Sequence, residues 1–146
     1  MQQTDEPREV FLAIPMIPDM EMAATQTADH VLRMLHFSDD QIDEVKHALI
    51  EACINAFEHS ASEEDQVFVT FRIEPEALVV VIQDFGHGFE PGAVERPQLE
   101  NKLGANYKRG WGLMMMESLM DAVTIESGPQ GTRITMTKKR TQEALS

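Results

Sequence analysis

Residues 38–60 read SDDQIDEVKHALIEACINAFEHS and contain the clearest periodic pattern in the sequence. Apolar residues recur there every three or four positions, at Ile42, Val45, Leu49, Ala52, Cys53, Ala56 and Phe57. This spacing places them along one face of an α-helix. Ser38 and Asp39 precede the pattern, and both residue types favour the N-cap position. The stretch therefore predicts a long helix with one apolar face.

The same helix would align polar side chains away from its apolar face. Glu51, Asn55 and His59 follow one another at four-residue intervals, so they would lie nearly above one another. A carboxylate, an amide and an imidazole in one column suit a hard-cation ligand combined with an acid or base. A solvated polar face with one capping histidine is the simpler alternative, and the helix pattern is compatible with both.

Patterns on both sides of this helix predict the other elements. Apolar runs or alternation predict strands, helical spacing predicts helices, and turn residues separate them. In chain order these are a strand over 10–14, a helix over 19–36, strands over 66–73 and 77–82, a helix over 111–120, and strands over 123–126 and 133–138. Because helices and strands are segregated rather than alternating, we expect an α+β fold, a two-layer sandwich with a mostly antiparallel sheet.

The chain has 146 residues, 42% of them hydrophobic and 25% charged, which is typical of one globular domain. We expect that domain over 10–138, with flexible segments over 1–9 and 139–146. The net charge of −13 disfavours nucleic-acid binding, because such proteins need a basic surface. The single cysteine, Cys53, excludes an intramolecular disulfide. Without a long apolar run or a signal peptide, we expect a cytoplasmic protein with no membrane contact.

Two glycine-rich motifs bound residues 84–110, a stretch without periodic pattern. The first, DFGHG over 84–88, offers a carboxylate for an amino group and a backbone that a flat ligand can approach closely. The second, KRGWGL over 108–113, places two cations and helix N-terminal amides where a polyphosphate could bind. An Asx turn and an ordinary glycine-rich helix start are the respective alternatives. A stretch of this length inside a compact domain is either disordered or functional.

The order and spacing of these motifs resemble the four ATP-binding boxes of the GHKL ATPase superfamily, the Bergerat fold. The boxes are E-x-x-x-N-A-x-x-H on a helix, D-x-G-x-G after a strand, R-G-x-G-L at a helix start, and Gly131-Thr132 entering the last strand. The resemblance covers residues 10–138. It is strongest to stand-alone anti-sigma factor serine/threonine-protein kinases of the RsbW and SpoIIAB type, through Glu44-Val45-Lys46 and residues 112–121. It implies a mixed, mostly antiparallel sheet covered by helices on one face.

The resemblance also implies a role for each matching residue. Glu51 would be the general base that takes a proton from a protein serine, and Asn55 would ligate Mg²⁺ on the ATP phosphates. Asp84 would accept the adenine amino group of ATP or ADP, supported by Thr132. Residues 95–109 would form a lid over the phosphates. The remaining nucleotide-binding residues would be Gly86, Gly88, Lys108, Arg109, Gly110, Gly112 and Leu113.

The function that the resemblance implies is transfer of the ATP γ-phosphate to a serine of a STAS-type anti-sigma factor antagonist. When free of that substrate, the kinase would bind a sigma factor. Two alternatives are an RsbT-like switch kinase that activates a phosphatase, and a nucleotide-gated binding module without kinase activity. A plain α+β interaction domain that binds no nucleotide is a third. We also expect a homodimer, because isolated domains of this kind commonly pair.

Overall fold

The computed structural model describes residues 8–58, 66–85, 105–129 and 131–140, with side chains left out over 105–111. Three helices and five strands follow one another in this part of the chain. Their bounds are β1 Arg8–Pro15, α1 Glu21–Met34, α2 Asp39–Glu58, β2 Gln66–Glu74, β3 Ala77–Asp84, α3 Ala105–Leu119, β4 Ala122–Gly128 and β5 Gly131–Lys139. The order of helices and strands is the one that the sequence predicts.

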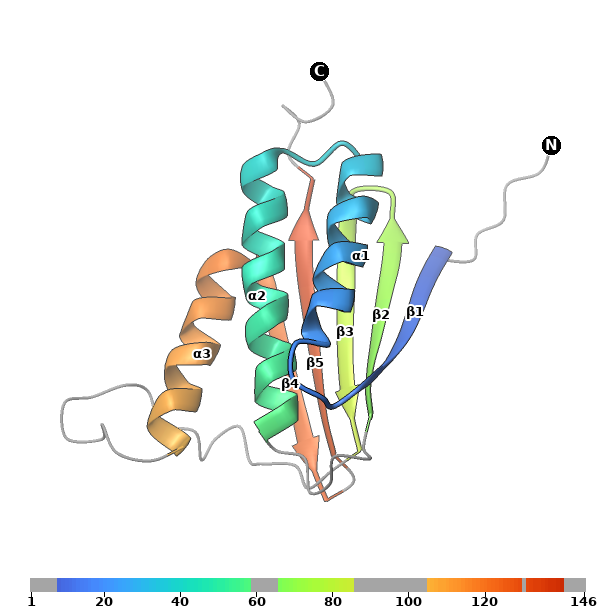
Figure 1. Ribbon diagram of the computed structural model, residues 1–146. Coiled ribbons are helices and arrows are strands. Elements are labelled where there is room, and N and C mark those ends of the chain that lie inside the picture. Colours follow the sequence, from blue (N-terminus) through green and yellow to red (C-terminus); the bar gives the residue numbers. More distant parts are fainter. Residues whose placement is uncertain (1–7, 59–65, 86–104, 130, 141–146) are drawn as a thin grey trace.

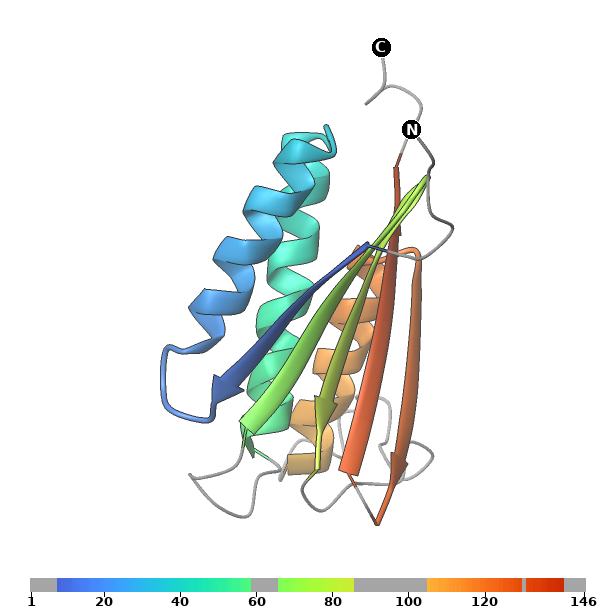
Figure 2. The same cartoon turned by 90° about the vertical axis from the view of Figure 1, so that its right-hand side faces the viewer.

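The strands form one sheet in the order β1-β2-β3-β5-β4 (Figure 1). All four pairings are antiparallel, where a mostly antiparallel mixed sheet was expected. The described helices lie on one side of the sheet, and Figure 2 shows the sheet edge-on with that layer beside it. The described residues therefore confirm the α+β sandwich with helices on one face.

The core lies between the sheet and the helices. Strands present alternate residues to it, as Val67, Val69 and Phe71 of β2 show, all of which are fully buried. The apolar stripe of α2 packs onto this layer, and its Leu49 and Cys53 are also fully buried. Burial raises the pKa of the Cys53 thiol to about 12, so this cysteine stays protonated at neutral pH.

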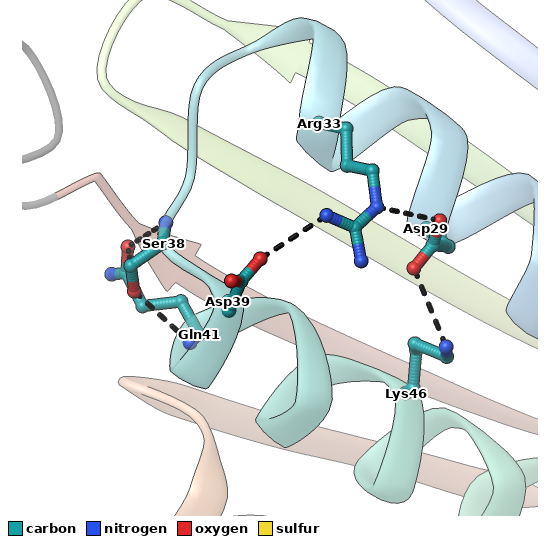
Figure 3. Close-up of polar contacts among 6 residues, drawn as sticks. All are labelled: Asp29, Arg33, Ser38, Asp39, Gln41 and Lys46. Carbon is teal, nitrogen blue, oxygen red and sulfur yellow. Dashed lines mark hydrogen bonds and ion pairs between the residues drawn. The ribbon is translucent and has the colours of Figure 1, made fainter.

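The connection between α1 and α2 is fixed by local hydrogen bonds. His36, at φ +64°, ends α1 in the left-handed conformation, and Phe37 N donates to Leu32 O over 3.0 Å. Ser38 then caps α2. Gln41 N donates to Ser38 Oγ at 3.1 Å, and Ser38 N donates to Gln41 Oε1 at 3.2 Å (Figure 3). This reciprocal pair is a capping box, so the predicted cap at Ser38 is confirmed.

Ion pairs join the outer faces of α1 and α2. Asp29 accepts from Arg33 Nε at 3.0 Å and from Lys46 Nζ at 3.3 Å, and Arg33 also reaches Asp39 at 3.1 Å (Figure 3). The hydrogen bond from Arg33 lowers the pKa of Asp29. Ion pairs at the surface contribute little to stability, so we expect the buried face between these helices to contribute more.

The predicted bounds agree with the structure to within two residues, except at the start of α3. Helix α3 begins at Ala105 rather than Trp111, so residues 105–109 of the expected lid are helical, and residues 95–104 lie outside the described part. Helix α1 is shorter than the predicted 19–36, because Asp19 has a φ of +75° and His36 is already left-handed. None of the described helices has the length and apolar character needed to cross a membrane.

The turn between β4 and β5 depends on a glycine that no other residue can replace without strain. Gly131 has a φ of +129°, and a Cβ there would lie 2.0 Å from Asp84 O. We expect Gly131→Ala to lower the free energy of unfolding by about 2 kcal/mol or more, measured by urea denaturation.

Gly128→Ala is the matched control for this substitution. Gly128 belongs to the same hairpin, but a Cβ there would meet nothing within 4 Å. We expect it to change the free energy of unfolding by less than about 0.5 kcal/mol. Equal stability of the two variants would contradict the strain argument.

Candidate functional site

The predicted site residues gather at one end of the sandwich. The C-terminal end of α2, the N-terminal end of α3, the end of β3 and the β4–β5 turn all lie at the lower end of Figure 1. Chain direction explains this, because α2 and β3 run toward that end whereas α3 and β5 start from it. Residues far apart in the sequence therefore come together at this end of the sandwich.

Glu51 of α2 lies directly against Gly112 of α3. A Cβ built on Gly112 would be 2.7 Å from Glu51 Oε2 and 3.1 Å from Glu51 Cδ, and Gly112 itself is buried. Any side chain at position 112 would therefore displace the carboxylate. Because Gly112 has no side chain, the backbone of α3 can approach Glu51. The structure thus brings together two residues that the sequence assigned to separate motifs.

Asn55 lies one helical turn beyond Glu51 and is buried, with 6% of its surface exposed. Most of this residue is therefore shielded from solvent, so the alternative of a solvated polar face is wrong at Asn55. His59, the third member of the predicted column, lies outside the described residues.

Asp84 and Thr132 are cross-strand partners at the last pair of the β3–β5 ladder. Both side chains are buried, with 4% and 3% exposed, and strand alternation turns them toward the helix layer. The Thr132 hydroxyl is 3.0 Å from the hydroxyl of Ser127 on β4. The expected adenine contacts, 48 residues apart in sequence, therefore sit side by side through sheet register.

Several predicted residues are only partly described. Gly86 and Gly88 lie outside the described residues. Lys108, Arg109 and Gly110 belong to the first turns of α3, and no side chains are described there. Leu113 is partly buried and packs against the core, next to the Gly112 contact. The structure thus brings together Glu51, Asn55, Gly112, Asp84 and Thr132 at one end of the molecule.

One structural residue at the opposite end of the sandwich was not singled out in the sequence. Lys138 of β5 is only 7% exposed, and its ammonium pairs with Glu44 of α2 at 2.9 Å. It also donates to the carbonyl oxygen of Leu119, the last residue of α3. A cation at a helix C-terminus is favourable. Lys138 therefore ties α2, α3 and the sheet together, and its inward position in the alternating strand pattern was the available signal.

The donor set fits a nucleotide with a metal ion better than a metal ion alone. No group of three His, Cys, Asp or Glu residues in the described part of the chain could hold a metal. A hard cation beside Asn55 would need phosphate or water oxygens to complete its shell, as Mg²⁺ commonly does. The glycine contact at position 112 keeps the Glu51 carboxylate next to the backbone of α3, one helical turn from Asn55. The residues present therefore fit Mg²⁺ bound together with polyphosphate.

Comparison with known sequences identifies relatives over most of the chain. Residues 17–138 match the family model of the histidine kinase-like ATPase domain. The anti-sigma F factor of Bacillus velezensis is 29% identical over 89% of this chain and 91% of that protein. The serine-protein kinase RsbW of the same organism is 30% identical over 88% of this chain and 84% of that protein.

Solved structures agree with this at the level of the fold. The RsbU and RsbW domains of a Mycobacterium tuberculosis protein match with a TM-score of 0.67 at 18% identity, over 91% of this chain and 32% of that one. The catalytic domain of histidine kinase ThkA matches with a TM-score of 0.56 at 14% identity, over 92% of this chain and 99% of that one. From the family match and these relatives, the chain belongs to the histidine kinase-like ATPase domain family, in the group that includes RsbW and the anti-sigma F factor.

Proposed function

We propose that this protein is an ATP-dependent protein-serine kinase and anti-sigma factor of a partner-switching system. The observation that carries the proposal is the contact of Glu51 with Gly112, one turn from the buried Asn55. Relatives named as a serine-protein kinase and as an anti-sigma factor support it. The proposed substrates are ATP and a serine of a STAS-type antagonist protein. The proposed compartment is the cytoplasm.

The nucleotide would bind where β3 ends and β5 begins. The Asp84 carboxylate would accept a hydrogen bond from the adenine amino group, and its burial would strengthen that bond. Thr132 beside it would support the same contact through its hydroxyl. Gly86 and Gly88 would let the adenine ring lie close to the backbone. Lys108, Arg109 and Gly110 would face the phosphates, together with the backbone of Gly112 and Leu113.

Chemistry would take place between α2 and α3. Asn55 would hold Mg²⁺ through its amide oxygen, and the ion, when bound, neutralises phosphate charge. Glu51 would accept the proton of the substrate serine hydroxyl while that oxygen bonds to the γ-phosphorus and ADP leaves. Phosphoryl transfer depends mainly on positioning and charge stabilisation, so few side chains suffice. The close fit of Gly112 would hold the Glu51 carboxylate in place for this step.

The proposed protein partners are a sigma factor and its antagonist. The net charge of −13 favours partner surfaces that are basic, and it disfavours direct contact with nucleic acid. The anti-sigma role rests on the names of the relatives, whereas the kinase role rests in addition on the site geometry. The RsbT-like kinase and the nucleotide-gated binding module are outcomes that the experiments below distinguish.

A second copy of this chain is the partner that we propose for the sheet face opposite the helices. Phe11, Phe68 and Phe85 form a continuous aromatic strip there, with ring centroids 5.8 and 5.5 Å apart. Phe11 and Phe85 are 61% and 66% exposed, and the strip lines a groove of about 410 Å³. No described helix covers this face. Exposed apolar patches of this kind mark interaction surfaces.

Charge explains why a second copy suits this face. The protein is strongly acidic as a whole, so two copies repel each other over most of their surfaces. Strand alternation, however, places acidic and basic side chains in balance on the strip's face: Glu9, Glu74 and Glu126 against Arg72, Arg133 and Lys139. A two-fold pairing can then set cations of one copy opposite anions of the other.

The base assignment predicts that Glu51→Gln loses phosphoryl transfer but keeps nucleotide binding. Without a proton acceptor, transfer should slow by about 100-fold or more. The measurement is transfer of label from ATP with Mg²⁺ to a STAS-type antagonist, beside calorimetry with ADP. Asp43→Ala, an exposed carboxylate on the same helix, should leave the rate unchanged.

The possible outcomes separate the functions under test. Transfer at the wild-type rate in Glu51→Gln would rule out the general-base role. Nucleotide binding by the wild type without transfer to any antagonist would favour the binding module. Transfer accompanied by activation of a phosphatase, with no sigma factor bound, would favour the RsbT-like kinase.

The adenine assignment predicts that Asp84→Asn binds ADP about tenfold more weakly, because a hydrogen bond to a buried charge is lost. Inosine diphosphate has a carbonyl in place of the amino group, and an asparagine amide can donate to that carbonyl. Binding of inosine diphosphate to this variant should therefore not weaken in the same way. Calorimetry with both nucleotides measures the ratio. An unchanged preference for ADP would place adenine elsewhere.

The pairing surface predicts that Phe11→Glu converts a homodimer into a monomer of 16.5 kDa. A carboxylate in the aromatic strip of each copy would add like charges across the two-fold axis. Met34→Glu is the control, because Met34 is similarly exposed, at 65% against 61% for Phe11, but lies on helix α1. Light scattering coupled to size-exclusion chromatography measures the mass. A wild-type protein that is monomeric, or a Phe11→Glu variant that stays dimeric, would contradict this surface.

A further inference from the structure

Gln83 is a polar residue of β3 whose side chain lies on the opposite side of the sheet from the proposed nucleotide pocket. Its amide nitrogen donates to Asp84 O at 2.9 Å and approaches Thr132 O at 3.3 Å. The first carbonyl belongs to β3 and the second to β5. A single side chain therefore bridges the two strands at the last pair of their ladder.

The Gln83 amide is itself held in orientation. Arg133, its cross-strand partner on β5, donates from Nε to Gln83 Oε1 at 2.8 Å. Because that bond engages the amide oxygen, the amide nitrogen faces the two backbone carbonyls. Arg133, Gln83 and the two carbonyls thus form one chain of hydrogen bonds across β3 and β5.

The two bridged carbonyls belong to the residues that would recognise adenine. Asp84 and Thr132 turn their side chains toward the helix layer, whereas Gln83 and Arg133 turn away from it. The strand ladder ends here, since β3 ends at Asp84 and β5 begins at Gly131. The last residue pair of a strand ladder has a neighbouring pair on one side only. Added hydrogen bonds therefore contribute most to holding the two strands together at this position.

We infer that Gln83, oriented by Arg133, is a positioning residue that holds Asp84 and Thr132 at the separation required for adenine recognition. This inference rests on the proposed function, and it assigns the selectivity for adenine partly to a residue that does not touch the nucleotide. Recognition of a hydrogen-bonding edge needs its partners placed to within about 0.5 Å, which supporting hydrogen bonds provide. The proposed selectivity is for adenine nucleotides over purine nucleotides that carry an oxo group in place of the adenine amino group.

The test compares two variants of Gln83 in the full-length chain. Gln83→Leu removes all hydrogen bonds of the side chain, whereas Gln83→Glu keeps an acceptor for Arg133 but loses the donor to the carbonyls. We expect both to bind ADP about three- to tenfold more weakly and to bind inosine diphosphate with little change. The preference for ADP over inosine diphosphate should therefore fall in both.

The ratio of the affinities for ADP and inosine diphosphate is the decisive measurement, because a purely structural role of Gln83 would leave that ratio unchanged. Loss of folded protein lowers apparent binding of both nucleotides by the same factor, so their ratio stays constant. Thr135→Val is the matched control, because Thr135 lies on β5 on the same face as Arg133, two residues further on. This variant should bind both nucleotides as the wild type does.

Each outcome is decisive. A wild-type preference for ADP that both Gln83 variants retain would overturn the positioning role and leave the proposed function intact. A preference lost in Gln83→Leu but kept in Gln83→Glu would overturn the donor role of the amide. Absence of any ADP preference in the wild type would overturn both the adenine site and this inference.

Discussion

The arrangement of the candidate site depends on the close contact between Gly112 and Glu51. A side chain at position 112 would occupy the place of the carboxylate, so the distance between α2 and α3 is set by the absence of a Cβ. The far end of α3 is fixed by a different contact, in which Lys138 binds Leu119 O and Glu44. Helix α3 is therefore held against α2 near its middle, at Gly112, and at its C-terminal end. The second of these contacts comes from β5, the strand that also carries Thr132.

Much of this fold follows from local sequence signals. The apolar spacing of α2 predicts its buried face, and Ser38 predicts its start as an N-cap. The structure adds the reciprocal bond from Gln41 that completes a capping box. The start of α3 is not predictable in this way, because two glycines within residues 108–113 lower helix propensity. Packing against α2 can override that preference. The burial of Lys138 also needs the whole fold, since Glu44 and Leu119 come from other elements.

In the candidate site too, some residues are placed together by local sequence spacing and others only by the three-dimensional fold. Glu51 and Asn55 lie one turn apart, so helical periodicity alone places them together. Asp84 and Thr132 meet only through the register of β3 and β5, and the family resemblance supplied what spacing could not. The solvated-face alternative fails at Asn55 because that residue is buried within the packed fold, which a helical wheel does not show. Gln83 gave no signal, because a glutamine in an alternating strand is typical of any outward position.

The two faces of the sheet carry different proposed sites, because strand alternation turns successive residues to opposite faces. Along β3 and β5, Asp84 and Thr132 turn inward toward the proposed nucleotide, whereas Gln83 and Arg133 turn outward. Phe85 follows Asp84 directly and belongs to the aromatic strip, in edge contact with Phe68. The proposed pairing surface and the proposed adenine pocket are thus separated by one residue of backbone. Any force that shifts the end of β3 on the outer face must also move Asp84 on the inner face, because one strand end carries both.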